Sequence, residues 1–252
     1  MNTRAEITLG CSAQMSCITC PDRHRSLCAS CEPDELRQVE AIRFFRAYEP
    51  GQTIAWETDL LDFVGTIVSG VVALTKIMAD GRTQVVAMLR PGNLLGHPYS
   101  PQISYNAIAS TSVVLCGFHR EPFKKLLDQI PALGRSLLEQ SSRELDASRE
   151  WILLLGSKNA REKVASFLAI CVRPRIEEDP SLVQKQMSLV LPFTRAEIGS
   201  YLSLSLETVS RQFSALKDDD IILPRGKRSV VIMNYPALLA ETGDDADGGW
   251  LA

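Results

Sequence analysis

Three features of the sequence predict an α+β fold with a β-rich half followed by a helical half. Alternating apolar and polar residues with turn signals dominate residues 51–118, whereas helical periodicity dominates from residue 131 onward. Two short helical patterns near the C-terminus are separated by a tight turn and followed by an apolar hairpin. Ahead of all these elements, residues 17–31 hold four of the chain's seven cysteines.

Length and composition exclude a membrane protein and a bulk polycation. The chain has 252 residues and a net charge of −3, enough for two modest domains. No apolar run approaches the ~18 residues of a membrane span, and the N-terminus lacks the apolar core of a signal peptide. We therefore expect a cytoplasmic protein with reduced thiols, in which nucleic-acid binding would come from a local patch.

The cysteine segment predicts a metal centre. Its spacing is C-x2-C-x7-C-x2-C, formed by Cys17, Cys20, Cys28 and Cys31. Thiolates bind zinc or iron–sulfur clusters, and two zinc knuckles are usually ~15–20 residues apart, so the short gap disfavours zinc without excluding it. A disulfide framework and unrelated surface cysteines are the alternatives. A cluster can take its fourth ligand from far along the chain, and the candidates are Cys11, Cys31, Cys116 and Cys171.

The residues after the cysteines predict one short helix and then a β-domain. A helical pattern covers residues 33–45, with Asp34 as a candidate N-cap. Strand patterns follow at residues 71–77 and 84–89. The flanking turn signals are Gly65, Ser69–Gly70, Asp80–Gly81 and Pro91–Gly92. Short strands at this cadence predict a small β-barrel or jelly roll.

A long helix is predicted from about residue 131 to residue 155. Leu138, Leu145 and Ile152 recur every seven residues, and Ser148 is one of the small residues on the alternate seam positions. Seven-residue spacing favours a partner helix, so we predict a dimer interface along this seam. The alternative is an amphipathic helix packed on its own barrel. The next helix begins behind Asn159, which has capping-box spacing to Glu162.

A helix-turn-helix is predicted near the C-terminus. Thr194 and Glu197 form a capping box for a helix over residues 195–202, and Ser205 caps a second helix after a break at residues 203–204. Ser203 stands where such a turn usually has glycine. In the second helix the packed face is predicted to hold Leu206, Val209, Phe213 and Leu216. The opposite, exposed face is predicted to hold Glu207, Ser210, Arg211 and Ser214.

The exposed face suits base recognition. Arginine can donate to O6 and N7 of guanine, glutamate can accept from N4 of cytosine, and serine can contact a base or a phosphate. The following hairpin has a cationic tip with Arg225, Lys227 and Arg228, placed to contact backbone phosphates. The alternative is a solvated helix face without a role. Residues 241–249 are acidic and glycine-rich, and we expect them to be disordered.

The sequence predicts, in order, a cysteine segment, a small β-domain, a long helix and a C-terminal helix-turn-helix with a hairpin. This arrangement resembles the Crp/Fnr family of bacterial transcription regulators, in particular its oxygen-sensing Fnr branch. Residues 207–211 match the E-x-x-S-R of the Fnr recognition helix, and residues 151–155 and 158–160 match the stretch after the dimer helix. The resemblance implies an N-terminal double-stranded β-roll (a jelly roll like that of cyclic-nucleotide-binding domains), a long dimerisation helix and a C-terminal winged helix-turn-helix. The expected segments are 1–35 (cluster-binding), 36–128 (β-roll), 129–158 (dimerisation helix), 159–238 (DNA-binding) and 239–252 (disordered tail).

The resemblance also implies a function and its residues. It implies a [4Fe-4S] cluster on Cys17, Cys20, Cys28 and Cys116, with Cys31 as the second candidate for the fourth ligand. It implies an oxygen-responsive homodimer, not an enzyme, that binds an inverted repeat like TTGAT-N4-ATCAA and works with RNA polymerase. The implied DNA contacts are Ser205, Glu207, Thr208, Ser210 and Arg211 on the helix, and Arg225, Lys227 and Arg228 on the wing.

Three rival hypotheses can be compared with this one, and the sequence argues against the first two. A cyclic-nucleotide-binding activator would need an arginine in the β-roll, but residues 105–108 contain none, so no cyclic nucleotide is expected. A thiol oxidoreductase would need a strand before its CxxC motif, and none is predicted. A regulator of the same fold with structural zinc or redox-active thiols would respond to another signal or to none.

Overall fold

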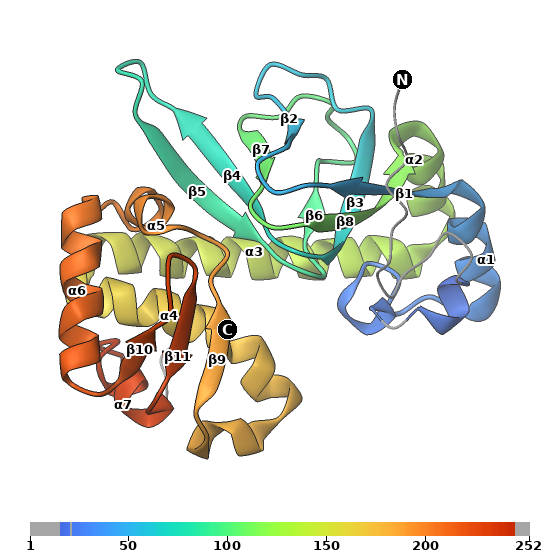
Figure 1. Cartoon of the computed structure of the whole chain (residues 1–252). Helices are drawn as coiled ribbons and strands as arrows, with labels where there is room; N and C mark the ends of the chain where they lie inside the picture. The colour runs from blue at the N-terminus through green and yellow to red at the C-terminus, as the bar shows by residue number, and fades with distance from the viewer. Residues whose placement is uncertain (1–15, 21, 245–252) are drawn as a thin grey trace. The chain divides into compact units, whose positions relative to one another are not determined.

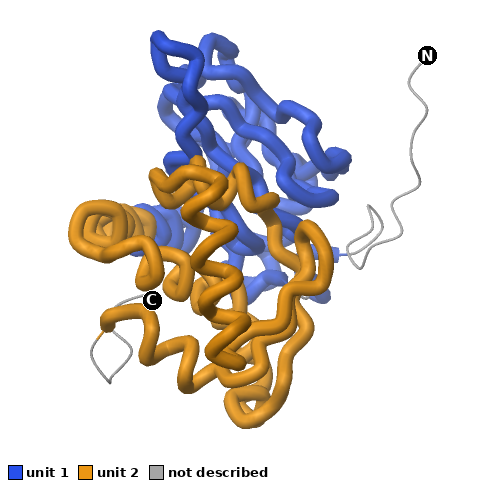
Figure 2. Tube along the Cα trace, turned by 60° about the vertical axis from the view of Figure 1, so that its left-hand side comes forward, with its two compact units in different colours: residues 1–143 blue, residues 144–252 orange. Residues whose placement is uncertain are grey.

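The computed structural model of the chain describes residues 16–20 and 22–244. The chain divides into two compact units, residues 1–143 and residues 144–252, coloured separately in Figure 2. The division falls within the long helix α3 (Pro131–Ser157). Among the described residues, no helix has the length and apolarity needed to cross a membrane.

The first unit is a double-stranded β-roll with helices at both ends of its sequence, as predicted (Figure 1). Its helices are α1 (Pro33–Ile42), α2 (Arg120–Gln129) and the start of α3. Its strands are β1 (Arg43–Tyr48), β2 (Thr53–Ala55), β3 (Phe63–Ser69), β4 (Val72–Ile77), β5 (Thr83–Leu89), β6 (Leu94–Leu95), β7 (Asn106–Ala109) and β8 (Val113–His119). They form two antiparallel sheets, in the orders β1-β8-β3-β6 and β2-β7-β4-β5.

Glycines shape the roll in two different ways. Gly70, Gly81 and Gly92 have positive φ and form the predicted turns. The prediction of a turn at Gly65 is wrong, because Gly65 lies within β3. A Cβ at Gly65 would lie 2.5 Å from Cδ2 of Leu115, so glycine is needed there to let the buried Leu115 side chain cross the strand.

The first helix differs from the prediction at both ends. Its N-cap is Glu32 rather than Asp34, because Glu32 and Glu35 form a reciprocal capping box around Pro33. It ends at Ile42 rather than near residue 45, since Phe45 pairs with β8 as part of β1. Tertiary pairing therefore overrides the helical pattern of the sequence at this point.

A single apolar cluster joins the cysteine segment to three helices of the first unit. The segment contributes Cys17, Leu27 and Cys31, which are 7%, 2% and 1% exposed. The helices contribute side chains that are all buried: Leu36 and Val39 from α1, Phe123, Leu126 and Leu127 from α2, and Ala132 and Leu133 from α3. The cysteine segment and the first turn of α3 thus share one core.

The second unit is a winged helix. Its elements are α4 (Ala160–Glu178), β9 (Met187–Val190), α5 (Arg195–Leu202), α6 (Leu206–Asp218), β10 (Ile222–Pro224), β11 (Ser229–Ile232) and α7 (Tyr235–Ala240). The three strands form an antiparallel sheet in the order β10-β11-β9, and the sequence analysis did not predict β9. Buried Phe167 of α4, Phe193 and Tyr201 of α5 pack their rings together. The predicted capping boxes at Asn159 and Thr194 are both present.

The expected disorder of the C-terminal tail is wrong for residues 239–244. Helix α7 extends to Ala240, and Thr242 is 2% exposed. Asp244 accepts a hydrogen bond at 2.6 Å from Nζ of Lys158, and only 17% and 10% of these two side chains are exposed. The charged residues that look solvated in sequence therefore hold the tail to the start of α4. The rest of the predicted tail, residues 245–252, lies outside the described residues.

Candidate functional site

Four of the predicted ligand cysteines line one cavity in the first unit. Cys17, Cys20 and Cys28 come from the N-terminal segment, and Cys116 comes from β8, where it pairs with Phe45 of β1. The cavity has a volume of about 40 Å³, more than one water requires. Cys31, which is 1% exposed, is not among the lining residues of this cavity. The fold therefore brings Cys116, distant in sequence, beside the three N-terminal cysteines.

The four cysteines line the cavity without forming a metal-binding group in this structure. Over residues 16–20 and 22–244, no three Cys, His, Asp or Glu side chains come close enough to hold one metal ion. The six cysteines within that part of the chain are free of disulfides, and Cys11 lies outside it. Zinc and iron–sulfur clusters both take thiolate ligands, so the cysteines of this cavity have the donor chemistry of either kind of centre.

Burial raises the pKa of several thiols in and beside this cavity. It raises the pKa of Cys28 to about 12 and the pKa of Cys31 to about 11, and neighbouring thiols add to the effect on Cys28. Burial also raises the pKa values of Cys17 and Cys116. Because only thiolates ligate metal, loading a metal centre must displace these protons.

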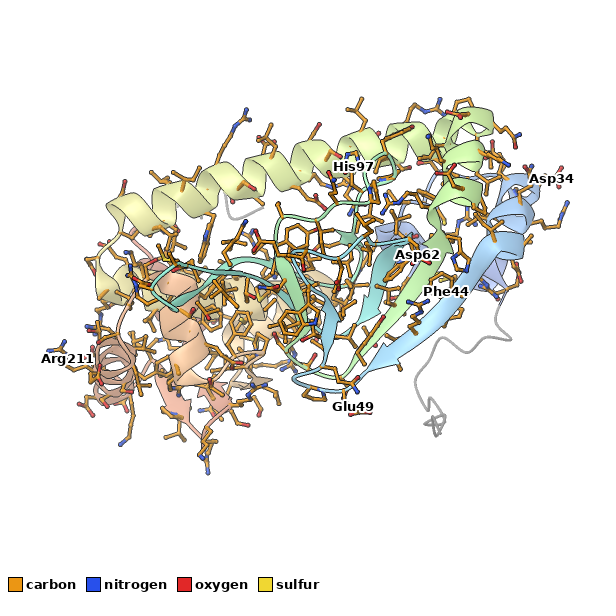
Figure 3. The ribbon with its side chains drawn as sticks, turned by 90° about the horizontal axis from the view of Figure 1, so that it is seen from above. Asp34, Phe44, Glu49, Asp62, His97 and Arg211 are labelled. Carbon is orange, nitrogen blue, oxygen red and sulfur yellow. The ribbon has the colours of Figure 1, made fainter. Side chains whose placement is uncertain are left out.

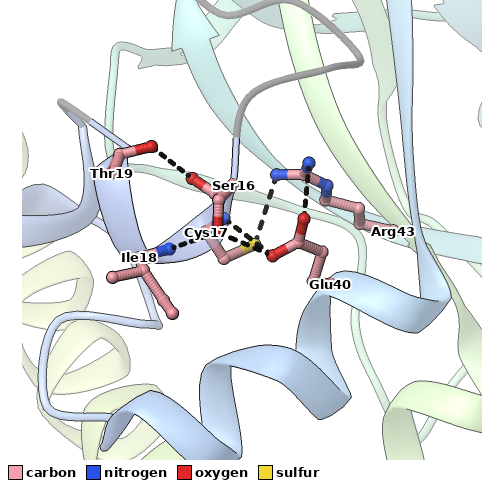
Figure 4. A network of polar contacts seen from close by, with 6 residues as sticks. All are labelled: Ser16, Cys17, Ile18, Thr19, Glu40 and Arg43. Carbon is pink, nitrogen blue, oxygen red and sulfur yellow. Dashed lines mark hydrogen bonds and ion pairs between the residues drawn. The ribbon is translucent and has the colours of Figure 1, made fainter.

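A polar network holds Cys17 at the edge of the cavity (Figure 4). Nη1 of Arg43 donates a hydrogen bond to Sγ of Cys17 at 3.3 Å, and Nη2 lies 3.4 Å from Oε1 of Glu40. Oε2 of Glu40 accepts from the backbone N–H of Cys17 at 3.0 Å and from the hydroxyl of Ser16 at 3.1 Å. Sequence reasoning missed Arg43 and Glu40, because no spacing rule relates them to the cysteines.

The cysteine segment is also tied to itself and to the roll. Nη2 of Arg23 donates to the carbonyl oxygen of Cys31 at 3.0 Å. A Cβ at Gly92 would lie 2.5 Å from the carbonyl oxygen of Arg25, so glycine in the turn after β5 permits the close approach of the segment. The position of the three N-terminal cysteines is therefore set by the roll as well as by α1.

In the second unit, α6 exposes the predicted recognition residues. Glu207, Ser210, Arg211 and Ser214 are exposed, and Val209, Phe213 and Leu216 are buried. Figure 3 shows Arg211 pointing away from the rest of this unit. Leu206 is 47% exposed, so its predicted place on the packed face is wrong. It is the first residue of the helix and precedes the part of α6 that packs on the core.

Local hydrogen bonds fix the turn before α6. Ser205 is the N-cap and accepts from the backbone N–H of Thr208, and the two hydroxyls lie 3.1 Å apart. Ser203 has φ 54° and ψ 45°, so it adopts the left-handed conformation that glycine usually supplies. A Cβ at Gly199 would lie 2.6 Å from the carbonyl oxygen of Leu204. Gly199, which sequence reasoning missed, therefore permits the tight turn.

The three cations of the wing are not equivalent. Arg225 and Lys227 are exposed at the tip between β10 and β11. Arg228 is half-buried; its guanidinium pairs with Glu197 at 3.0 Å and donates to the carbonyl oxygen of Pro192 at 3.2 Å. Arg228 thus ties the wing to α5, whereas Arg225 and Lys227 face solvent.

The predicted seam of α3 has an apolar, exposed surface. Leu138, Leu145 and Ile152 are 70%, 52% and 71% exposed. The hydroxyl of Ser148 donates to the carbonyl oxygen of Glu144 at 2.7 Å within the helix. Because this hydroxyl already has a partner, Ser148 can be buried in a helix pair without an unsatisfied donor.

The chain combines a β-roll that carries a cysteine-lined cavity, a long helix, and a winged helix with an exposed Glu/Ser/Arg face. This combination defines a DNA-binding regulator. The family described as cyclic nucleotide-binding domain matches residues 45–130, and the family described as Crp-like helix-turn-helix domain matches residues 162–241. Together with the relatives below, these matches show that the chain belongs to the Crp/Fnr family of transcription regulators, which are not enzymes.

The relatives cover nearly the whole chain. The transcriptional activator protein FnrL of Cereibacter sphaeroides is 46% identical over 237 residues, which are 92% of this chain and 94% of that protein. The nitrogen fixation regulation protein FixK of Bradyrhizobium diazoefficiens is 34% identical over 80% of this chain and 83% of that protein. The solved structure of FixK2 from Bradyrhizobium japonicum has a TM-score of 0.71 at 29% identity, covering 81% of this chain and all of that one.

Proposed function

We propose that the chain is an oxygen-responsive transcriptional activator whose [4Fe-4S] cluster promotes dimerisation and binding to an inverted-repeat operator. The observation that carries the proposal is the cavity lined by Cys17, Cys20, Cys28 and Cys116. The 46% identity to a protein named as the activator FnrL supports the same assignment. The cluster would supply an oxygen-labile centre, and the four thiolates would hold it.

Packing supports a path from the cavity to the dimer helix. Cys17 and Leu27 are buried in the same apolar cluster as Ala132 and Leu133, at the start of α3. A change in the order of the cysteine segment would therefore alter the core on which α3 rests. The segment needs no contact with the second unit to transmit this signal.

The exposed seam of α3 supports a homodimer. Leu138, Leu145 and Ile152 would pack against the same residues of a second copy, with the small Ser148 allowing close approach. A two-fold dimer presents two recognition helices to successive major grooves, so its operator is an inverted repeat. The family resemblance implies TTGAT-N4-ATCAA.

The exposed face of α6 supports sequence recognition by this dimer. Arg211 would donate to the guanine of each half-site, and Glu207 would accept from a cytosine. The backbone N–H of Glu207 lowers the pKa of the Glu207 carboxyl by a hydrogen bond, and the hydroxyl of Ser205 lowers it further. Glu207 is therefore ionised and can accept a hydrogen bond from a base. RNA polymerase is the partner that an activator at such a promoter would recruit.

Anaerobic purification tests the proposal and its rival. We expect brown protein with about four iron and four sulfide per protomer. Sedimentation should show a dimer without air and a lighter species after exposure to air. Colourless protein that contains zinc, or protein with neither metal, would refute the cluster and favour the zinc or redox-thiol alternative. An unchanged mass in both states would refute the dimer switch.

A further inference from the structure

We propose that Arg43 and Glu40 are positioning residues that set the reduction potential of the cluster. Arg43 would act by donating a hydrogen bond to the ligand Cys17 and by supplying a buried positive charge, and Glu40 by a negative charge that partly offsets it. The proposal rests on the cluster proposed above. Neither residue is a ligand, and neither lies within the cysteine motif. Their effect would be on how readily the cluster accepts and gives up an electron.

The position of Arg43 at the start of β1 places its side chain in the lining of the cavity. Arg43 is the first residue of β1, and its side chain is only 8% exposed. Arg43 and Phe45 both line the cavity, whereas Arg46 points to the other face of the strand, over the rings of Phe44 and Phe63. Two arginines three residues apart on one strand therefore lie in different environments.

The two arginines that line the cavity donate to different kinds of acceptor. Arg23 donates to the carbonyl oxygen of Cys31, so its guanidinium holds the backbone of the segment. Arg43 instead donates to a sulfur, Sγ of Cys17, at 3.3 Å. Hydrogen bonds to ligand sulfurs and the local net charge both tune the potential of an iron–sulfur cluster.

Glu40 couples the ligand loop to the guanidinium. One carboxylate oxygen accepts from the backbone of Cys17 and the hydroxyl of Ser16, and the other faces Arg43. The carboxylate thus partly offsets the charge of Arg43 while fixing both partners. Because a reduced cluster is more negative than an oxidised one, a nearby cation favours reduction and a nearby carboxylate opposes it.

This charge arrangement predicts opposite effects for two isosteric variants. Arg43→Gln removes the cation and should lower the midpoint potential of the cluster. Glu40→Gln keeps an acceptor for the loop but removes the anion, so it should raise the potential. The expected change in each case is about tenfold in the equilibrium constant for reduction, or ~59 mV for one electron. A role in folding alone would not produce shifts of opposite sign.

The experiment uses anaerobically purified full-length protein. Each variant is titrated with dithionite, which donates one electron to convert the [4Fe-4S]2+ state to the [4Fe-4S]+ state, and the reduced cluster is counted by EPR. Arg43→Lys should restore part of the wild-type potential, since it keeps the charge but changes the hydrogen bond. Arg46→Gln is the matched control and should leave the potential unchanged.

The outcomes separate this inference from the proposed function. A wild-type protein without iron and sulfide overturns both. A wild-type cluster whose potential is the same in Arg43→Gln and Glu40→Gln, or shifts in the same direction in both, overturns only the inference. If Arg43→Gln fails to retain a cluster, an upward shift in Glu40→Gln still supports the inference, and no shift there overturns it.

Discussion

The different environments of the wing cations predict that the neighbouring Lys227 and Arg228 have different effects on DNA binding. Arg225 and Lys227 are exposed, whereas Arg228 pairs with Glu197 and donates to the carbonyl oxygen of Pro192. Replacing Lys227 by alanine should remove a phosphate contact and leave the fold intact. Replacing Arg228 by alanine should loosen the wing from α5 and leave the number of free cations unchanged.

The expected size of the Lys227→Ala effect follows from counterion release. Each phosphate contact contributes about 0.9 to the slope of log affinity against log salt, and a dimer carries two wings, so the slope should flatten by about 1.8. Between 50 and 200 mM salt, the variant should therefore lose roughly tenfold less affinity than the wild type. Arg225→Ala should behave in the same way.

Arg228→Ala should instead reduce stability. Both side chains of its ion pair with Glu197 are more than a third exposed, so solvent screening weakens the pair. The pair and the hydrogen bond to the carbonyl oxygen of Pro192 should together contribute about 1 kcal/mol to the free energy of unfolding. Binding to a labelled operator at several salt concentrations and thermal unfolding of the same proteins measure the two effects. A salt slope that flattens as much in Arg228→Ala as in Lys227→Ala would show that the ion pair opens on DNA, and would refute this reasoning.

Four further predictions test the cavity and the second unit. Cys116→Ser should abolish cluster retention and Cys31→Ser should not, as measured by anaerobic iron analysis. Gly199→Ala should destabilise the helix-turn-helix by about 1–3 kcal/mol through overpacking, as measured by denaturant unfolding. Lys158→Met should cost about 1.5–3 kcal/mol by leaving Asp244 without its charged partner. Burial raises the pKa of Cys31 from 9.0 to about 11, so the metal-free protein should lose stability as the pH rises from 9 to 11 and keep it below 9.

Each of these predictions has a result that contradicts it. Cluster loss in Cys31→Ser with retention in Cys116→Ser would reverse the fourth ligand. Unfolding curves of Gly199→Ala or Lys158→Met that coincide with the wild type would contradict the close approach or the ion pair. A metal-free protein equally stable at pH 9 and pH 11 would contradict the raised thiol pKa.

Local signals predicted where α4, α5 and α6 begin. The capping boxes at Asn159 and Thr194 lie where the sequence analysis placed them, since each depends on side chains only three residues apart. The break at residues 203–204 was also predicted from local spacing, whereas a serine at position 203 did not indicate the left-handed conformation that it adopts. Local spacing was not sufficient everywhere, because the capping box of Glu32 and Glu35 at the start of α1 was missed.

Contacts between distant residues escaped prediction. The composition of the tail predicted a solvated segment, but Asp244 accepts a hydrogen bond from Lys158, which lies 86 positions away in the sequence. The pairing of Arg228 with Glu197 spans 31 positions, and no pattern distinguishes it from a free wing cation. Cys116 is a similar case, because spacing left four candidates for the fourth ligand and only the family resemblance selected one.

Side-chain packing gives the magnitude by which loss of the cluster would reach the dimer helix. Leu27, which is 2% exposed, shares its core with Leu133 at the start of α3. Releasing one buried leucine costs ~1.5–3 kcal/mol, and each 1.4 kcal/mol corresponds to about tenfold in an association constant. In the proposed dimer, serines on the α3 seam would limit the apolar area buried between the two helices, so a change of this size would be large beside the association free energy. If this free energy were transmitted in full through the shared core to the proposed dimer, loosening of the cysteine segment around one side chain would shift the dimer equilibrium by roughly one to two orders of magnitude.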